Sequence, residues 1–255
     1  MKIVLLSKAY GAYRGRLLET IRSEISTMIA ELDASLVNMG TDKKNRIIVN
    51  IKGEDEEFVA NALAKEYGKS LLSDDLSPNA IYPGRLLDVG KVGYGLYVDI
   101  GVTDSLRMDA LIPLHKMREQ LNLLGPLTTI IKAFVLVEYL PVEVKLTTID
   151  LYSNRVEAEF NQKLMSRLKE WLQDDHERLL VFGANHGQIE SSLKKSGHRE
   201  DIYEIEQLGK FEFSLRCKRS TRASGILAAI GPRLRGVPMH LFIPKELEAI
   251  QNAKA

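Results

Sequence analysis

The stretch at residues 88–101, DVGKVGYGLYVDIG, determines how the middle of the chain folds. Its glycines, at positions 90, 93, 95 and 101, alternate with aliphatic and aromatic residues. A dinucleotide-binding loop has the spacing GxGxxG and opens a helix. Here the glycines lead into LYVDIGV, an alternating and β-prone sequence. The stretch therefore predicts a strand, a glycine-rich turn and a second strand, and it does not predict a phosphate loop.

The sequence around this stretch is rich in predicted strands. We expect strands near residues 84–89, 96–101, 107–112, 131–138 and 142–148, with a helix over 113–121 between the third and the fourth. This order is typical of a small closed β-barrel of the oligonucleotide-binding kind. We assign residues 79–150 to such a barrel domain.

The two flanking segments predict α+β modules. In residues 1–78, strands at 3–6, 36–39 and 46–52 and helices at 13–32 and 58–67 give the order β-α-β-β-α. Residues 151–177 predict a connecting helix. Residues 178–255 give β-α-β-β-α-β, the order of a ferredoxin-like module. The expected fold class is therefore a multidomain α+β protein with a central barrel.

Charge is distributed unevenly along the chain. The net charge is +1, but residues 210–236 carry seven basic residues and one acidic residue. Such a cluster is the electrostatic footprint of a polyanion-binding face, and a solvated basic surface is the alternative. The candidate RNA-contacting residues in this segment are Arg216, Lys218, Arg219, Arg222, Arg233 and Arg235.

The same segment predicts an anion site. Alternation in residues 211–218 gives a strand with one apolar face and one increasingly basic face. Ser220, Thr221 and Ser224 are candidate caps for the following helix, whose free N–H groups would lie beside Arg219 and Arg222. A helix start next to arginines is suited to binding an anion.

Tyr94 and Tyr97 are candidates for stacking on unpaired bases. Three positions apart on a regular strand, they would point to opposite faces, so a shared platform requires a bend, which Gly95 could supply. The alternative is that one tyrosine covers the barrel core and the other has no role in binding.

Chemistry other than binding finds little support in the sequence. The five histidines lack the HxxxH and HExxH spacings of metal sites, and the single cysteine, Cys217, cannot form a CxxC pair. We expect no catalytic site, no metal and no cofactor. A lone cysteine fits a reducing cytoplasm, and no apolar segment reaches the ~18 residues of a membrane-spanning helix, so no membrane partner is expected.

The central block carries a distinctive set of residues: Gly84, Asp88-Val89, Gly93 to Val98, Ile100-Gly101 and Asp109 to Pro113. By these residues it resembles the S1-type RNA-binding domain. The resemblance implies an RNA-binding barrel in which Tyr94 and Tyr97 occupy the positions of the base-stacking aromatic residues. Pro113 stands where S1 domains often carry an RNA-contacting histidine, and His115 follows two residues later.

Near its end the chain carries Cys217-Lys218, Thr221, Gly225-Ile226 and Ile230-Gly231. By these residues, and over its whole length, it also resembles an archaeal family of uncharacterised proteins that places such a barrel between two α+β segments. The resemblance implies an archaeal cytoplasmic protein and implies no particular activity.

Two functional hypotheses follow. The first is a non-enzymatic RNA-binding or ribosome-associated protein, with stacking by the barrel and phosphate contacts by the carboxy-terminal module. The second is a homo-oligomeric regulatory or ligand-sensing protein that uses the ferredoxin-like modules and has the barrel as a scaffold. An enzyme ranks third, because no catalytic motif supports it.

Overall fold

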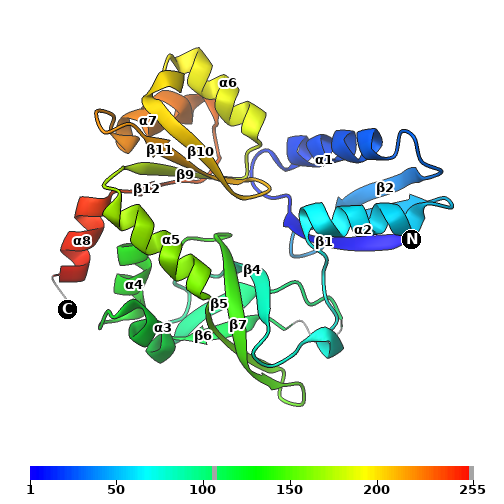
Figure 1. Cartoon of the computed structure of the whole chain (residues 1–255), viewed down its shortest axis with the longest axis horizontal. Helices are drawn as coiled ribbons and strands as arrows, with labels where there is room; N and C mark the ends of the chain where they lie inside the picture. Colours follow the sequence, from blue (N-terminus) through cyan, green and yellow to red (C-terminus); the bar gives the residue numbers. More distant parts are fainter. Residues whose placement is uncertain (105–107, 253–255) are drawn as a thin grey trace.

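The computed structural model describes residues 1–104 and 108–252. In this part of the chain, eight α-helices accompany a closed five-stranded barrel in the middle and a separate sheet toward each end. The expected mixed α+β class is confirmed. We call the three parts the N-terminal module (residues 1–78), the barrel module (79–177) and the C-terminal module (178–252), and Figure 1 shows them meeting at a common centre.

The N-terminal module is a three-stranded antiparallel sheet in the order β1-β3-β2. Leu17 and Ile21 of α1 and Leu63 of α2 pack with Leu5 and Val49 of the sheet in one core. These helices form because their apolar residues recur every three or four positions. The elements are β1 (Lys2–Lys8), α1 (Arg14–Met28), β2 (Ser35–Thr41), β3 (Arg46–Lys52) and α2 (Glu56–Tyr67).

The barrel closes in the order β4-β5-β6-β8-β7, with β7 pairing back onto β4. The quoted glycine-rich stretch is strand, turn and strand, since β4 ends at Leu87 and β5 begins at Gly95. The elements of the module are β4 (Ile81–Leu87), β5 (Gly95–Asp99), β6 (Ala110–Pro113), α3 (Leu114–Leu121), α4 (Leu127–Phe134), β7 (Pro141–Asp150), β8 (Arg155–Phe160) and α5 (Gln162–Gln173).

The prediction of one barrel strand was wrong. Residues 127–134 form α4 where a strand was predicted over 131–138, because Leu127, Ile130 and Phe134 recur at helical spacing and are buried together. The fifth strand is β8 instead, whose alternate residues Val156 and Ala158 enter the core. The start of the third predicted strand, at residue 107, lies outside the described residues.

The C-terminal module has an antiparallel sheet in the order β10-β11-β9-β12. Helices α6 and α7 cover one face of it. On the other face, Leu180 and Phe242 share a core with the barrel module, including Trp171 of α5. The elements are β9 (Arg178–Phe182), α6 (His186–Ser196), β10 (Ile202–Gly209), β11 (Glu212–Cys217), α7 (Ala223–Ile230), β12 (Met239–Phe242) and α8 (Pro244–Asn252), a helix that the sequence analysis missed.

The modules are joined by buried charged groups. Arg85 of β4 pairs with Glu212 of β11 at 2.7 Å between Nη1 and Oε2, and both side chains are buried. The Tyr10 hydroxyl donates to the other oxygen of Glu212 at 2.6 Å. The Tyr10 ring also stacks on Tyr139 of the barrel module at 4.1 Å between centroids. Each module thus contributes a polar group to this cluster, which we call the junction cluster.

A second buried pair joins the N-terminal module to the barrel. Lys8 Nζ of β1 lies 2.6 Å from Asp99 Oδ2 of β5, and both side chains are at most 1% exposed. Burial opposes ionisation of Asp99, but the attraction of Lys8, together with that of Lys44 and Arg46, outweighs it and holds the pKa of this carboxyl below its usual value. On the other side of the pair, burial outweighs the attraction of Asp99 and lowers the pKa of the Lys8 ammonium from its usual value.

Close packing at the junction explains why residue 209 is a glycine. A Cβ at Gly209 would lie 2.2 Å from Glu212 Oε2 and 3.0 Å from Pro141 Cγ. The turn between β10 and β11 can approach the Arg85–Glu212 pair only because residue 209 lacks a side chain. Phe211, two residues after Gly209, is buried in the core of the N-terminal module, which fixes the tip of this hairpin there.

We predict that Glu212→Gln lowers the free energy of unfolding by about 3–5 kcal/mol, because it leaves the buried Arg85 guanidinium without a counter-charge. Urea denaturation followed by circular dichroism measures the change. The matched control is Lys91→Gln, which removes the exposed pair with Asp88 and should leave the midpoint unchanged. Equal midpoints for the two variants would contradict the account.

Candidate nucleic-acid interface

The structure brings Tyr94 and Tyr97 together. Their hydroxyl oxygens lie 2.7 Å apart and their rings meet edge to face, with centroids 6.4 Å apart. Tyr94 is 56% exposed and Tyr97 is half-buried. The hydrogen bond to Tyr94 raises the pKa of the Tyr97 hydroxyl. The two side chains thus share one surface of the barrel, and their stacking on bases stays a prediction.

Gly95 lies between the two tyrosines at the first position of β5. A Cβ there would come within 2.5 Å of the Ile112 carbonyl oxygen, so the glycine allows β5 and β6 to approach closely. The neighbouring charged groups come partly from the N-terminal module. Asp109 also contributes to the raised pKa of Tyr97, and it pairs with Lys44 of the β2–β3 loop at 2.7 Å.

Arg216 does not lie on an open basic strand face. β11 is an interior strand, and Glu212 and Ser214 on its polar side are fully buried. Arg216 Nε lies 3.3 Å from Asp174 Oδ2, and its guanidinium packs over the Tyr203 ring at 5.5 Å. The face of β11 that the sequence pattern predicted to be basic therefore packs against the barrel module.

The start of α7 is already occupied by a carboxylate of this chain. Glu177 Oε2 accepts a hydrogen bond from the Ala223 amide at 2.7 Å. Glu177 Oε1 lies 3.4 Å from Arg222 Nη1. No side chain of Ser220, Thr221 or Ser224 caps the helix. Glu177 therefore takes the position in which the sequence analysis expected an external anion.

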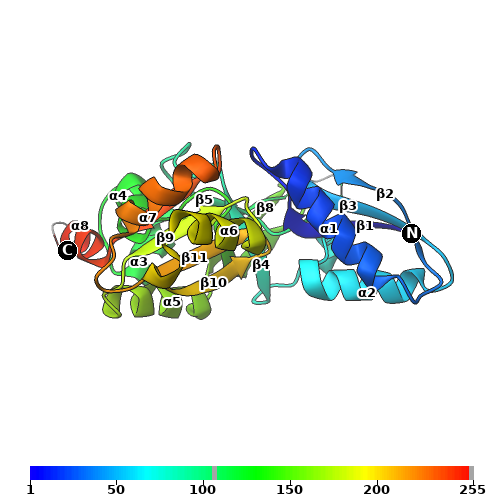
Figure 2. The same cartoon turned by 90° about the horizontal axis from the view of Figure 1, so that it is seen from above.

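A groove between α1 and α6 brings Arg233 together with two basic residues that were not predicted, Arg16 and Lys195. It has a volume of about 610 Å³ and lies between the N-terminal and C-terminal modules, which Figures 1 and 2 show side by side. Asn185 Nδ2 donates across the module boundary to Thr20 Oγ1 at 2.9 Å. We call it the α1–α6 groove, and its lining residues are Tyr13, Arg16, Asn185, Gly187, Gln188, Ser191, Ser192, Lys195, Pro232, Arg233 and Leu234.

The charge in this groove is positive and unneutralised. Arg16, Lys195 and Arg233 are exposed, none of them forms an ion pair within the described part of the chain, and the lining contains no described carboxylate. Arg233 donates to the Lys195 carbonyl at 3.0 Å, and Arg16 packs over the Tyr13 ring at 5.2 Å. Closely spaced cations without counter-charges create a potential that attracts phosphate.

The remaining predicted residues lie outside this lining. Lys218, Arg219 and Arg235 form no ion pair among the residues that the structure describes, and Arg219 and Arg235 are exposed. Sequence reasoning missed Arg16 and Lys195. Residues 13–16, YRGR, interleave aromatic and basic side chains, which was an available signal.

Three family models match the chain in succession: the DUF2110 N-terminal domain over residues 2–71, the central domain over 76–172 and the C-terminal domain over 176–241. The chain belongs to the DUF2110 family. The resemblance to an uncharacterised family built on three parts is thereby confirmed. No helix within residues 1–104 and 108–252 of this DUF2110 protein is long and apolar enough to cross a membrane. No group of three potential metal-binding side chains occurs in the same ranges.

Similar solved structures are remote. An uncharacterised protein, MJ1198, of Methanocaldococcus jannaschii has a TM-score of 0.24 and 14% identity, and the match covers 34% of this chain and 95% of that one. A chain in an a/eIF2alpha–aDim2p–rRNA complex from Pyrococcus horikoshii has a TM-score of 0.27 and 11% identity, and the match covers 48% of this chain and 64% of that one. No curated protein matches the chain.

We predict that Cys217 resists thiol reagents in the folded protein. Its side chain is fully buried, and burial raises the pKa of the thiol to about 12. Since the thiolate is the reactive form, labelling by Ellman's reagent at pH 8 should require denaturant. Rapid labelling of the native protein would show that this end of β11 is open to solvent.

Proposed function

We propose that this DUF2110 protein is a non-enzymatic RNA-binding protein, with RNA or the ribosome as its partner. The α1–α6 groove carries the proposal, because it gathers three unpaired cations from two modules without a described carboxylate in its lining. Phosphate neutralisation supplies much of the affinity for nucleic acid, and such a groove offers it. Arg219 and Arg235, which are exposed, and the half-buried Lys218 add positive charge on the C-terminal module.

The barrel supports the proposal through its topology and its tyrosines. Numbering its strands in chain order gives 1-2-3-5-4, the arrangement we assign to an S1-like oligonucleotide-binding barrel. Tyr94 and Tyr97 would stack on unpaired bases there, since they share an exposed surface. We assign the C-terminal module, with its order β-α-β-β-α-β, to the ferredoxin-like type.

The contributions of the predicted basic residues should differ. Arg216 and Arg222 already have carboxylate partners, Asp174 and Glu177, within this chain. Contacts from them to RNA would require the loss of these ion pairs. Arg233 and Arg235 need no such exchange, and we expect them to contribute more.

Replacing Arg16, Lys195 and Arg233 together by Gln should weaken RNA binding and reduce its dependence on salt. Each lost phosphate contact lowers the slope of log K against log[salt] by about 0.7–0.9, so three contacts account for about 2–3. Fluorescence anisotropy with one single-stranded and one hairpin RNA at several salt concentrations measures both quantities.

The matched control replaces three exposed lysines outside the groove, Lys52, Lys65 and Lys169, by Gln, with the same change in net charge. It should retain the slope. If the two triple variants lost the same RNA affinity and salt slope, the effect would come from overall charge, and the groove would be rejected as the binding site. Replacing Tyr94 and Tyr97 by Ala should weaken binding of the single strand with an unchanged salt slope.

A further inference from the structure

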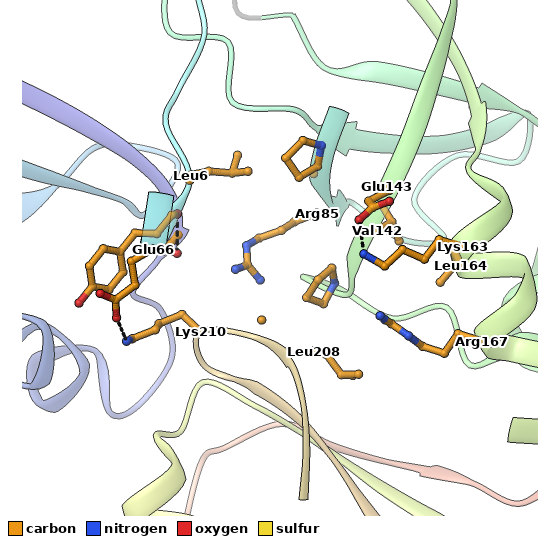
Figure 3. Close-up of a pocket in the computed structure, with 17 residues that line it drawn as sticks. Leu6, Glu66, Arg85, Val142, Glu143, Lys163, Leu164, Arg167, Leu208 and Lys210 are labelled. Atoms are coloured by element: carbon orange, nitrogen blue, oxygen red, sulfur yellow. Dashed lines mark hydrogen bonds and ion pairs between the residues drawn. The ribbon is translucent and has the colours of Figure 1, made fainter. Parts of the chain in front are cut away.

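A separate cleft lies where the three modules meet. It has a volume of about 270 Å³ and is lined by all three modules. The N-terminal module contributes Leu6, Ser7 and the end of α2, the barrel module contributes β4, β7 and α5, and the C-terminal module contributes the turn between β10 and β11. We call it the junction cleft, and Figure 3 shows its lining.

Four cationic side chains converge on the junction cleft from different elements: Arg85, Lys163, Arg167 and Lys210. In Figure 3 the Arg85 guanidinium points into the middle of the cavity, Lys163 and Arg167 reach toward it from α5, and Lys210 lies on the opposite side. Glu66 and Glu143 are the carboxylates in the described lining. The lining itself therefore has more cations than carboxylates, and Glu24, Glu206 and Glu212 approach these cations from outside it.

The four cations differ in the ion pairs that they form within the chain. Arg85 Nη1 holds Glu212, and Lys210 lies 2.8 Å from Glu24 and 3.0 Å from Glu66. Both sets of contacts are part of the module junction. They leave the α5 side of the cleft as the place where an additional anion can bind.

On the α5 side the internal partners are weak. Lys163 is 65% exposed and pairs with Glu143 at 2.7 Å, and this pair lowers the pKa of Glu143. Arg167 Nε lies 3.7 Å from Glu206 Oε1, beyond hydrogen-bond length. An exposed pair contributes little stability, so an incoming anion displaces it at small cost.

Apolar side chains form much of the remaining wall. A small concave site with apolar walls and a few converging charged groups, located between domains, is the usual form of a small-molecule site. The apolar lining residues are Leu6, Pro83, Pro141, Val142, Leu164 and Leu208.

We propose that the junction cleft binds a small organic anion, a carboxylate or a phosphate monoester. The anionic group lies between Arg85, Lys163 and Arg167, and the carbon skeleton packs against Pro141, Leu164 and Leu208. Because all three modules line the cleft, the bound anion stabilises their common arrangement. This site is separate from the α1–α6 groove, and it gives the protein a ligand-sensing function that does not depend on RNA binding.

The test uses the full chain with three probes: inorganic phosphate, succinate and 3-phosphoglycerate. Isothermal titration and thermal unfolding are measured at constant ionic strength, with chloride as the reference anion. At least one probe should bind saturably and raise the unfolding midpoint. Arg167→Gln and Lys163→Gln should each weaken that binding at least tenfold, whereas Lys169→Gln, an exposed substitution on α5 outside the cleft, should not change it.

Absence of saturable binding by all three probes overturns the proposal. Binding that survives both Arg167→Gln and Lys163→Gln also overturns it. The triple variant of Arg16, Lys195 and Arg233 separates the two sites, since it should retain anion binding while losing RNA affinity. If that variant loses both, the anion binds in the groove and the cleft proposal fails.

Discussion

The arrangement of the three modules depends on charges that are paired only when the modules are together. Glu212 is fully buried and receives Arg85 from the barrel module and the Tyr10 hydroxyl from the N-terminal module. Lys8 and Asp99 form a second buried pair between modules. Separating a buried pair leaves an uncompensated charge, which is strongly unfavourable. Any packing of the modules that left these groups buried but unpaired would be disfavoured, so the pairs select one arrangement.

Both candidate sites follow from that arrangement. The α1–α6 groove needs Arg16 of the N-terminal module beside Lys195 and Arg233 of the C-terminal module. The junction cleft needs all three modules, and Arg85 belongs both to its lining and to the junction cluster. The residues that hold the modules together are thus continuous with those that we propose bind anions.

Local patterns in the sequence predict most of the elements but not their partners. Helical spacing in α1 and alternation in β11 were sufficient to place these elements. The β-branched residues of α4 favoured a strand over their helical spacing, and only the burial of Ile130 and Phe134 against the barrel resolves the conflict. The proximity of Tyr94 and Tyr97 depends on the path of the chain around Gly95. The sequence alone left open whether the two side chains share a face.

The candidate sites depend on contacts between distant segments. A count of charge along residues 210–236 cannot show that Asp174 and Glu177 neutralise Arg216 and Arg222, because both carboxylates precede that segment. Such a count also cannot show that Arg16 and Arg233, which are far apart in the sequence, line the same groove. Tertiary packing therefore changes which basic residues are available for the RNA contacts that we propose.

The most direct test of the central claim is hydrogen–deuterium exchange of the full chain with and without a saturating RNA. The account predicts added protection in residues 13–16, 186–195 and 232–235, which form the groove from two modules. Protection confined to the C-terminal module, with residues 13–16 unchanged, would contradict a groove shared between modules.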